Sequence, residues 1–94
     1  MDEKNRELLA KTAIHIHCFS LALLTRIAEK NRKEDCVMLL KNLEIADEIT
    51  SYIQPYMNKD ESFMLRIITT AVDKELSMVQ FIIENILTGE DNER

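Results

Sequence analysis

The chain contains a single glycine, Gly89, and a single proline, Pro55, among its 94 residues. A β-rich fold needs several tight reversals, and those reversals depend strongly on glycine and proline. The sequence therefore predicts a few long elements joined by short connections. A chain of this length also predicts one domain rather than several.

Apolar residues recur at helical spacing in three blocks, and no stretch of four or more residues keeps a clean period of two. This pattern predicts helices over residues 3–30, 33–54 and 60–88. We expect residues 1–89 to form one helical domain. The acidic tail, residues 90–94, is expected to be frayed because it is polar throughout.

Capping signals mark the ends of these helices. Asp2 is a predicted N-cap for the first helix, where its charge also suits the helix dipole. Asn31 and Asn58 are each followed three residues later by a glutamate, the spacing of a reciprocal cap, so each is predicted to open the next helix. Pro55 should end the second helix, and Gly89 should end the third as a left-handed C′ residue.

The apolar arcs of these helices are wider than a surface helix needs. The arc of the second helix spans roughly 180 to 200° and that of the third roughly 220°, whereas about 100° is enough to face a core. The residues predicted to form the second helix's apolar arc are Cys36, Met38, Leu39, Leu43, Ile45, Ala46, Ile49 and Ile53.

Short connections make consecutive helices antiparallel neighbours, so the predicted fold is all-α, an antiparallel (up-down-up) three-helix bundle. Each helix of such a bundle faces only two others, and arcs this broad would leave apolar rows in water. We therefore predict a homodimer that associates through the first and third helices. The candidate interface residues are Ile14, Leu21, Phe63, Ile67, Phe81 and Ile82.

The charge balance restricts the partners. Seventeen acidic and twelve basic side chains give a net charge of −5, which repels nucleic acids and anionic lipid headgroups and favours a basic protein partner. The longest uncharged stretch, residues 12–25, is shorter than a membrane span, and the segment before it has no net positive charge. We expect no membrane partner, no export signal and a cytoplasmic location.

The histidines and cysteines do not form a recognisable metal site. His15 and His17 point about 200° apart on a helix and cannot share an ion, and His15 with Cys18 would still need two further ligands. His15 is expected to face solvent and His17 to lie at the edge of the core.

Cys18 and Cys36 are predicted to be core thiols, too far apart for a disulfide.

The chain shows no recognisable nucleophile, general base, phosphate loop or metal set, so no cofactor is expected. The predicted function is a non-enzymatic protein-interaction module, such as an adaptor, chaperone or inhibitor. It would act through apolar helix faces, with an acidic rim that selects the partner.

An alternative function comes from the outline of the fold. Three long helices in about ninety residues resemble the small helical chorismate mutases, intertwined dimers that hold a dicarboxylate with Arg and Lys side chains. Arg6, Arg26, Lys41 and Gln80 are the candidate anion-binding residues under this resemblance. That family's Ile-Asp-x-x-Asp run after an Arg is absent here, and the helical wheel aims Arg26 and Lys41 outward.

Overall fold

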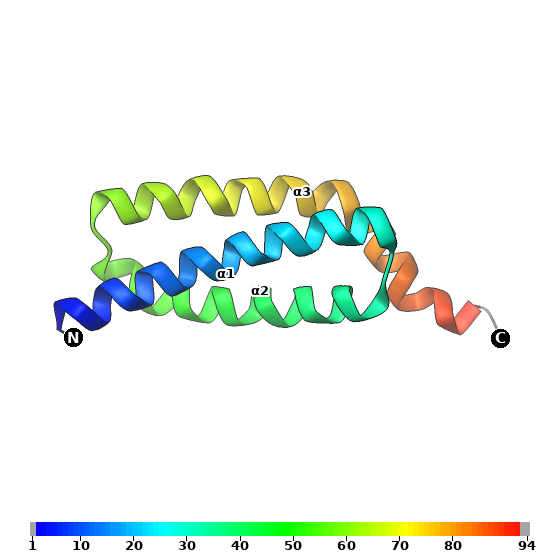
Figure 1. The fold of residues 1–94 in the computed structure, drawn as a ribbon, viewed down its shortest axis with the longest axis horizontal. Helices are drawn as coiled ribbons and strands as arrows, with labels where there is room; N and C mark the ends of the chain where they lie inside the picture. The colour runs from blue at the N-terminus through cyan, green and yellow to red at the C-terminus, as the bar shows by residue number, and fades with distance from the viewer. Residues whose placement is uncertain (1, 93–94) are drawn as a thin grey trace.

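The computed structural model describes residues 2–92, which contain only helices and their connections (Figure 1). The α-helices are α1 (Glu3–Lys30), α2 (Lys33–Ile53) and α3 (Lys59–Asn92), and a short 3-10 helix, η1 (Gln54–Tyr56), follows α2. The predicted all-α class and the helical bundle are confirmed for this part of the chain.

α1 is the central helix of the molecule (Figure 1). It packs along both α2 and α3, whereas α2 and α3 barely touch each other. The molecule measures 54 × 20 × 16 Å, and its radius of gyration is 15.2 Å. A compact domain of this length has a radius of about 12 Å. The molecule is therefore a rod, with more exposed surface than a compact domain of the same length. The last part of α3 extends past the connection between α1 and α2.

The largest apolar side chains gather toward the end of the rod where α1 connects to α2. The buried cluster there consists of Leu23, Leu24, Ile27, Cys36, Leu39, Val72, Val79 and Ile83. Near the opposite end the buried apolar residues include the small Ala10 and Ala13 together with Ile53 and Leu65. Each buried Leu or Ile stabilises the fold by about 1.5–3 kcal/mol, so apolar stabilisation is concentrated near the α1–α2 connection.

Two of the predicted caps are confirmed. The Asp2 carboxylate accepts a hydrogen bond from the Asn5 backbone N–H at 2.8 Å and starts α1. At the start of α3, Asn58 Oδ1 accepts from the Glu61 N–H at 2.8 Å, and Glu61 Oε1 accepts from the Asn58 N–H at 3.0 Å. This is the reciprocal cap that the Asn-x-x-Glu spacing predicts.

The predicted cap at Asn31 is wrong. Asn31 has a left-handed backbone, φ 53° and ψ 45°, and its N–H donates to the Ile27 carbonyl at 2.9 Å, so it ends α1. A residue that caps a following helix needs an extended backbone instead. Arg32 has that conformation and precedes α2, without a side-chain capping bond.

The predicted end of the third helix is also wrong. α3 continues through Gly89 to Asn92, and Gly89 does not adopt a positive φ. Residues 90–92, predicted to be frayed, are thus helical, and residues 93–94 lie outside the described part of the chain. The helix continues because its i to i−4 hydrogen bonds need no side chain, and glycine lowers helix stability by only about 1 kcal/mol relative to alanine.

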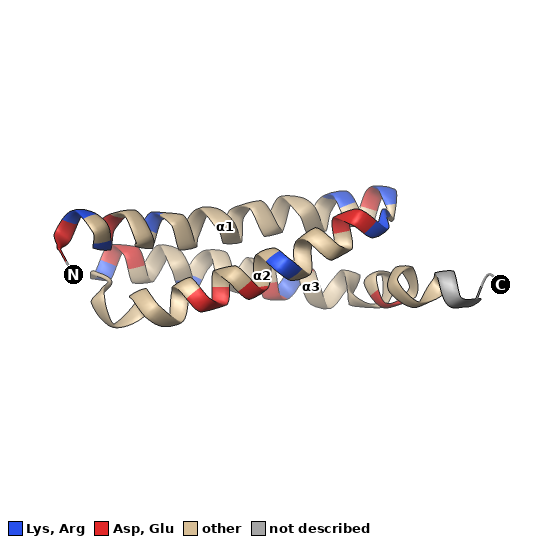
Figure 2. Ribbon diagram, turned by 90° about the horizontal axis from the view of Figure 1, so that it is seen from below, with Lys and Arg blue, Asp and Glu red and all other residues tan. Residues whose placement is uncertain are grey.

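The expectation of no membrane partner stays a prediction, because α1 is long and apolar enough to span a membrane by length and composition alone. The helix contains an 18-residue window with a mean hydropathy of 1.5, which satisfies the length and composition criterion. Figure 2 shows charged residues at both ends of α1 and none along its middle. The same helix contacts both others and buries seven residues inside the bundle, and 33% of the apolar window is buried.

Candidate protein-interaction surfaces

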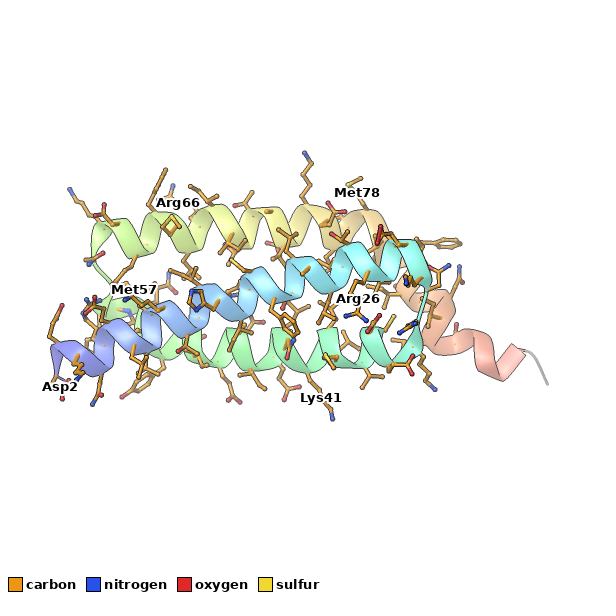
Figure 3. All side chains as sticks on the ribbon, in the orientation of Figure 1. Asp2, Arg26, Lys41, Met57, Arg66 and Met78 are labelled. Atoms are coloured by element: carbon orange, nitrogen blue, oxygen red, sulfur yellow. The ribbon has the colours of Figure 1, made fainter. Side chains whose placement is uncertain are left out.

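The outer face of α3 carries large apolar side chains that the bundle leaves in solvent. These residues, which we call the α3 stripe, are Phe63, Met64, Ile67, Met78 and Phe81. At 3.6 residues per turn, four of them lie within roughly 60° of one another on the helix surface. Figure 3 shows Met78 pointing from α3 away from the other helices. The stripe extends from Phe63 to Phe81, a distance of about 27 Å along the helix axis.

The structure divides the six predicted interface residues into two groups. Phe63, Ile67 and Phe81 are exposed by 59%, 51% and 72%, and all three belong to the α3 stripe. Leu21 and Ile82 are half-buried and pack against the core cluster. Ile14 is half-buried as well. The residues of α1 are thus largely used within the chain, because α1 lies between the other two helices.

Sequence reasoning missed a second exposed row on α2. Met38 and Ile45, which we predicted to belong to the apolar arc of this helix, are about half exposed, and so is Tyr52. These residues recur every seven positions and share one face, which we call the α2 stripe. The ring of Tyr52 lies 6.4 Å from that of Tyr56. The arc of roughly 180 to 200° was the available signal, since one helical neighbour covers only about half of it.

A groove opens between α2 and α3, with α1 as its floor. One hollow of about 210 Å³ is lined by His17, Leu43, Asp47, Thr69, Val72, Asp73 and Leu76. A neighbouring hollow of about 270 Å³ shares Thr69 and is also lined by Thr50, Gln54, Leu65 and Arg66. We call this surface the α2–α3 groove. It exists because α2 and α3 each pack on α1 but hardly on each other.

His17 is the buried polar residue on the floor of the groove. Its side chain is in hydrogen-bond contact with Thr50 Oγ1 through Nε2 at 3.3 Å, and Nδ1 has no partner among the described residues. Burial lowers the pKa of His17, while the carboxylates of Asp47 and Asp73 act in the opposite direction. Since burial is the larger effect, His17 is neutral at pH 7 and does not balance the two carboxylates.

The cations proposed under the mutase resemblance do not converge. Arg6 and Arg26 are twenty residues apart on α1, or about 30 Å along the helix. Arg6 donates to Glu3 and Glu61, and Arg26 lies 3.7 Å from the buried carboxylate of Asp35. Figure 3 shows Lys41 extending from α2 on the flank opposite α3. Arg6 joins α1 to α3 through Glu61, and Arg26 joins α1 to α2 through Asp35.

The thiols and the possible metal ligands are separate. Within residues 2–92, no group of three or more His, Cys, Asp or Glu side chains is placed to hold a metal ion. Cys36 is buried as predicted, and burial raises the pKa of its thiol. The prediction of a core position for Cys18 is wrong, because Cys18 is exposed.

Comparison with known proteins adds no relative from which a function could be transferred. No protein family, no curated protein and no solved structure matches this chain. The functional interpretation therefore depends on the surfaces described above.

Proposed function

We propose that this chain is a non-enzymatic protein-interaction module of the cytoplasm, an up-down-up three-helix bundle that acts as an adaptor, chaperone or inhibitor. The observation that supports it is the α3 stripe, where Phe63, Ile67 and Phe81 are all more than half exposed. Monomeric soluble proteins rarely expose contiguous apolar patches of more than a few hundred Å². A row of large apolar side chains at helical spacing suits docking against another helix.

The stripe is also self-complementary, which favours the homodimer. In an antiparallel pair of α3 helices centred between residues 72 and 73, the stripe meets apolar residues of the second copy. The pairs are Phe63 with Ile82, Met64 with Phe81, and Ile67 with Met78. A two-fold dimer uses the same patch on both subunits, so this symmetry is what it requires.

One charged residue, Lys74, lies within the stripe between Ile67 and Met78. In the same antiparallel arrangement it is opposite Ala71 of the second copy. A small side chain leaves room for the aliphatic stem of the lysine, while its ammonium reaches water at the edge of the interface. The charge is therefore compatible with an apolar pairing of the two helices.

The test is the mass in solution of the wild-type chain and of stripe variants, measured by light scattering. We expect the wild type at twice the 11.0 kDa subunit mass, and Phe81→Glu or Ile67→Glu at the subunit mass. A charge placed in an apolar interface is left without a partner, which costs several kcal/mol. Leu8→Glu is the matched control because the exposure of Leu8, 62%, lies between those of Ile67 and Phe81, and because Leu8 belongs to α1.

Affinity capture with a carboxyl-terminal tag completes the test. A stoichiometric partner that is lost with Phe81→Glu and retained with Leu8→Glu supports the adaptor, chaperone or inhibitor assignment. A wild type that is monomeric and captures nothing contradicts the proposal, as does an effect of Leu8→Glu equal to that of the stripe variants.

A further inference from the structure

The helices occupy three of the four corners of a bundle. In a four-helix bundle each helix packs along two neighbours and contacts the diagonal helix little. α1 packs along both α2 and α3, which hardly touch, so α2 and α3 are placed like a diagonal pair. The α2–α3 groove is the fourth corner. Its two adjoining hollows, of about 210 and 270 Å³, lie along the direction that a fourth helix would follow.

The inner parts of the two walls of the groove are apolar. Val72 and Leu65 are buried, and Leu43 and Leu76 are half-buried against the core. These side chains come from both α2 and α3, so the apolar side of an entering helix would contact both walls at once. Each large apolar side chain that the groove removes from water contributes about 1.5–3 kcal/mol.

The hollow that contains His17 carries negative charge, and no Lys or Arg is among the residues that line it. Asp47 of α2 and Asp73 of α3 line the same hollow from opposite sides, and both act on His17 beneath them. Neither carboxylate forms an ion pair with another described residue. His17 is only 4% exposed and leaves Nδ1 without a hydrogen-bond partner among the described residues. A cation placed in this hollow would lie between two carboxylates.

We propose that the α2–α3 groove binds a basic amphipathic helix of a partner protein. Its apolar side chains would lie on Leu43, Val72 and Leu76, and a Lys or Arg would lie between Asp47 and Asp73. This inference rests on the proposed function and specifies the chemistry of the partner. Arg66 lines the other hollow and favours the carboxyl end of the entering helix there, since that end of a helix dipole is negative.

The net negative charge of the chain favours a different protein, rather than a second copy of this chain, as the occupant of the α2–α3 groove. A second copy brings a further net charge of −5 toward two unpaired carboxylates, and this repulsion opposes association through the groove. The α3 stripe offers self-association an apolar surface on the outer face of the same helix.

The probe is a synthetic amphipathic peptide of about 18 residues built from Leu and Lys, long enough for about 27 Å of helix. A peptide with Glu at every Lys position is the control for apolar contact alone. We compare the wild type with the double variant Asp47→Asn, Asp73→Asn. The matched control is Glu29→Gln, Glu48→Gln, which removes the same charge from exposed positions outside the groove.

We expect the Leu-Lys peptide to bind the wild type, and the groove double variant to weaken it at least about tenfold. The control double variant should weaken it less than about threefold, since exposed charges are screened by solvent. In NMR spectra the imidazole signals of His17 should shift on binding. His15, exposed on the outer side of α1, should not respond. Thermal unfolding of each variant checks that it is folded.

Several outcomes overturn the inference. Equal weakening by the two double variants would mean that the peptide responds only to overall charge. Loss of peptide binding with Phe81→Glu but not with the groove variant would place the peptide on the α3 stripe. A change of mass with the groove variant would place a second copy in the groove. The dimer and capture results with Phe81→Glu decide the proposed function separately.

Discussion

The two connections between the helices contain the same sequence signal and use it differently. Asn31 and Asn58 each precede a glutamate by three residues. At Asn58 the signal produces a reciprocal cap, with hydrogen bonds of 2.8 and 3.0 Å to and from Glu61. At Asn31 it produces a left-handed residue that ends the preceding helix. A capping signal therefore indicates where a helix can begin. Whether a helix begins there depends on the residues that precede the signal.

The difference lies in what precedes each asparagine. Pro55 and η1 interrupt the chain before Asn58, so its backbone is free to be extended. Nothing interrupts α1 before Asn31, and two residues separate α1 from α2. Asparagine tolerates the left-handed region better than other non-glycine residues, so Asn31 satisfies the carbonyl of Ile27 instead.

The energetic role of the two glutamates differs as well. Glu61 accepts from Asn58 and from the Arg6 guanidinium of α1, which joins the start of α3 to the start of α1. Glu34 has no such capping bond. The end of the rod near η1, with its smaller buried side chains, thus depends on polar contacts, whereas the other end depends on the apolar cluster.

The largest expected effect sharpens this contrast. Glu61→Ala removes the acceptor of both the Asn58 N–H and Arg6, and we expect the free energy of unfolding to fall by about 2 kcal/mol. Glu34→Ala should change it by no more than about 0.5 kcal/mol. Urea denaturation of both variants provides the measurement. Equal losses would show that the two glutamates have the same role.

A smaller effect is expected at Asn31. Asn31→Ala places a Cβ-bearing residue without a compensating side chain at φ 53°, which should cost about 1 kcal/mol. Asn31→Gly should be neutral within about 0.5 kcal/mol, because glycine adopts this conformation readily. The comparison of the two variants by thermal unfolding checks the left-handed cap. If Asn31→Gly were as destabilising as Asn31→Ala, the side chain rather than the backbone would be responsible.

The smallest effect concerns pH. The hydrogen bond from Arg6 holds the pKa of Glu61 below its usual value of 4.5, although burial opposes the shift. Because the folded pKa is the lower one, the carboxylate stabilises the fold above about pH 4.5. This stabilisation is lost as the pH falls through the folded value. Glu61→Gln keeps a cap acceptor but removes the charge, and we expect a loss below about 1 kcal/mol at pH 7.

The pH measurement is the difference in the free energy of unfolding between the wild type and Glu61→Gln. This difference should shrink as the pH is lowered from 7 toward 3, because the protonated glutamic acid and glutamine then have the same charge. Carboxylates that do not contact Arg6 titrate alike in both proteins and cancel in the comparison, whereas Glu3, which shares Arg6 with Glu61, is removed from it by introducing Glu3→Gln in both proteins. A difference that stays constant with pH would contradict a charged contact with Arg6.

Much of the fold follows from local patterns. The apolar periodicity predicted the three helices, α1 over the observed residues, and Asp2 and Asn58 were identified as caps from their own side chains. Of the candidate surface, Phe63, Ile67 and Phe81 were identified because they lie at the edge of an arc wider than the core requires. These signals are local, since a helix and its caps involve neighbours within four residues.

Only the tertiary structure decided which helix lies at the centre. A wide apolar arc indicates that a helix can pack against two neighbours. All three helices, α1, α2 and α3, have such an arc. Because α1 took the central position, Leu21 became part of the packing, while Met38 and Ile45 of α2 were left exposed. The groove with Asp47 and Asp73 likewise depends on how far α2 and α3 stand apart, and no residue encodes that separation alone. The sequence determined the helices and their caps through contacts of short range, whereas the choice of partner for each face is a competition among the helices that only packing resolves.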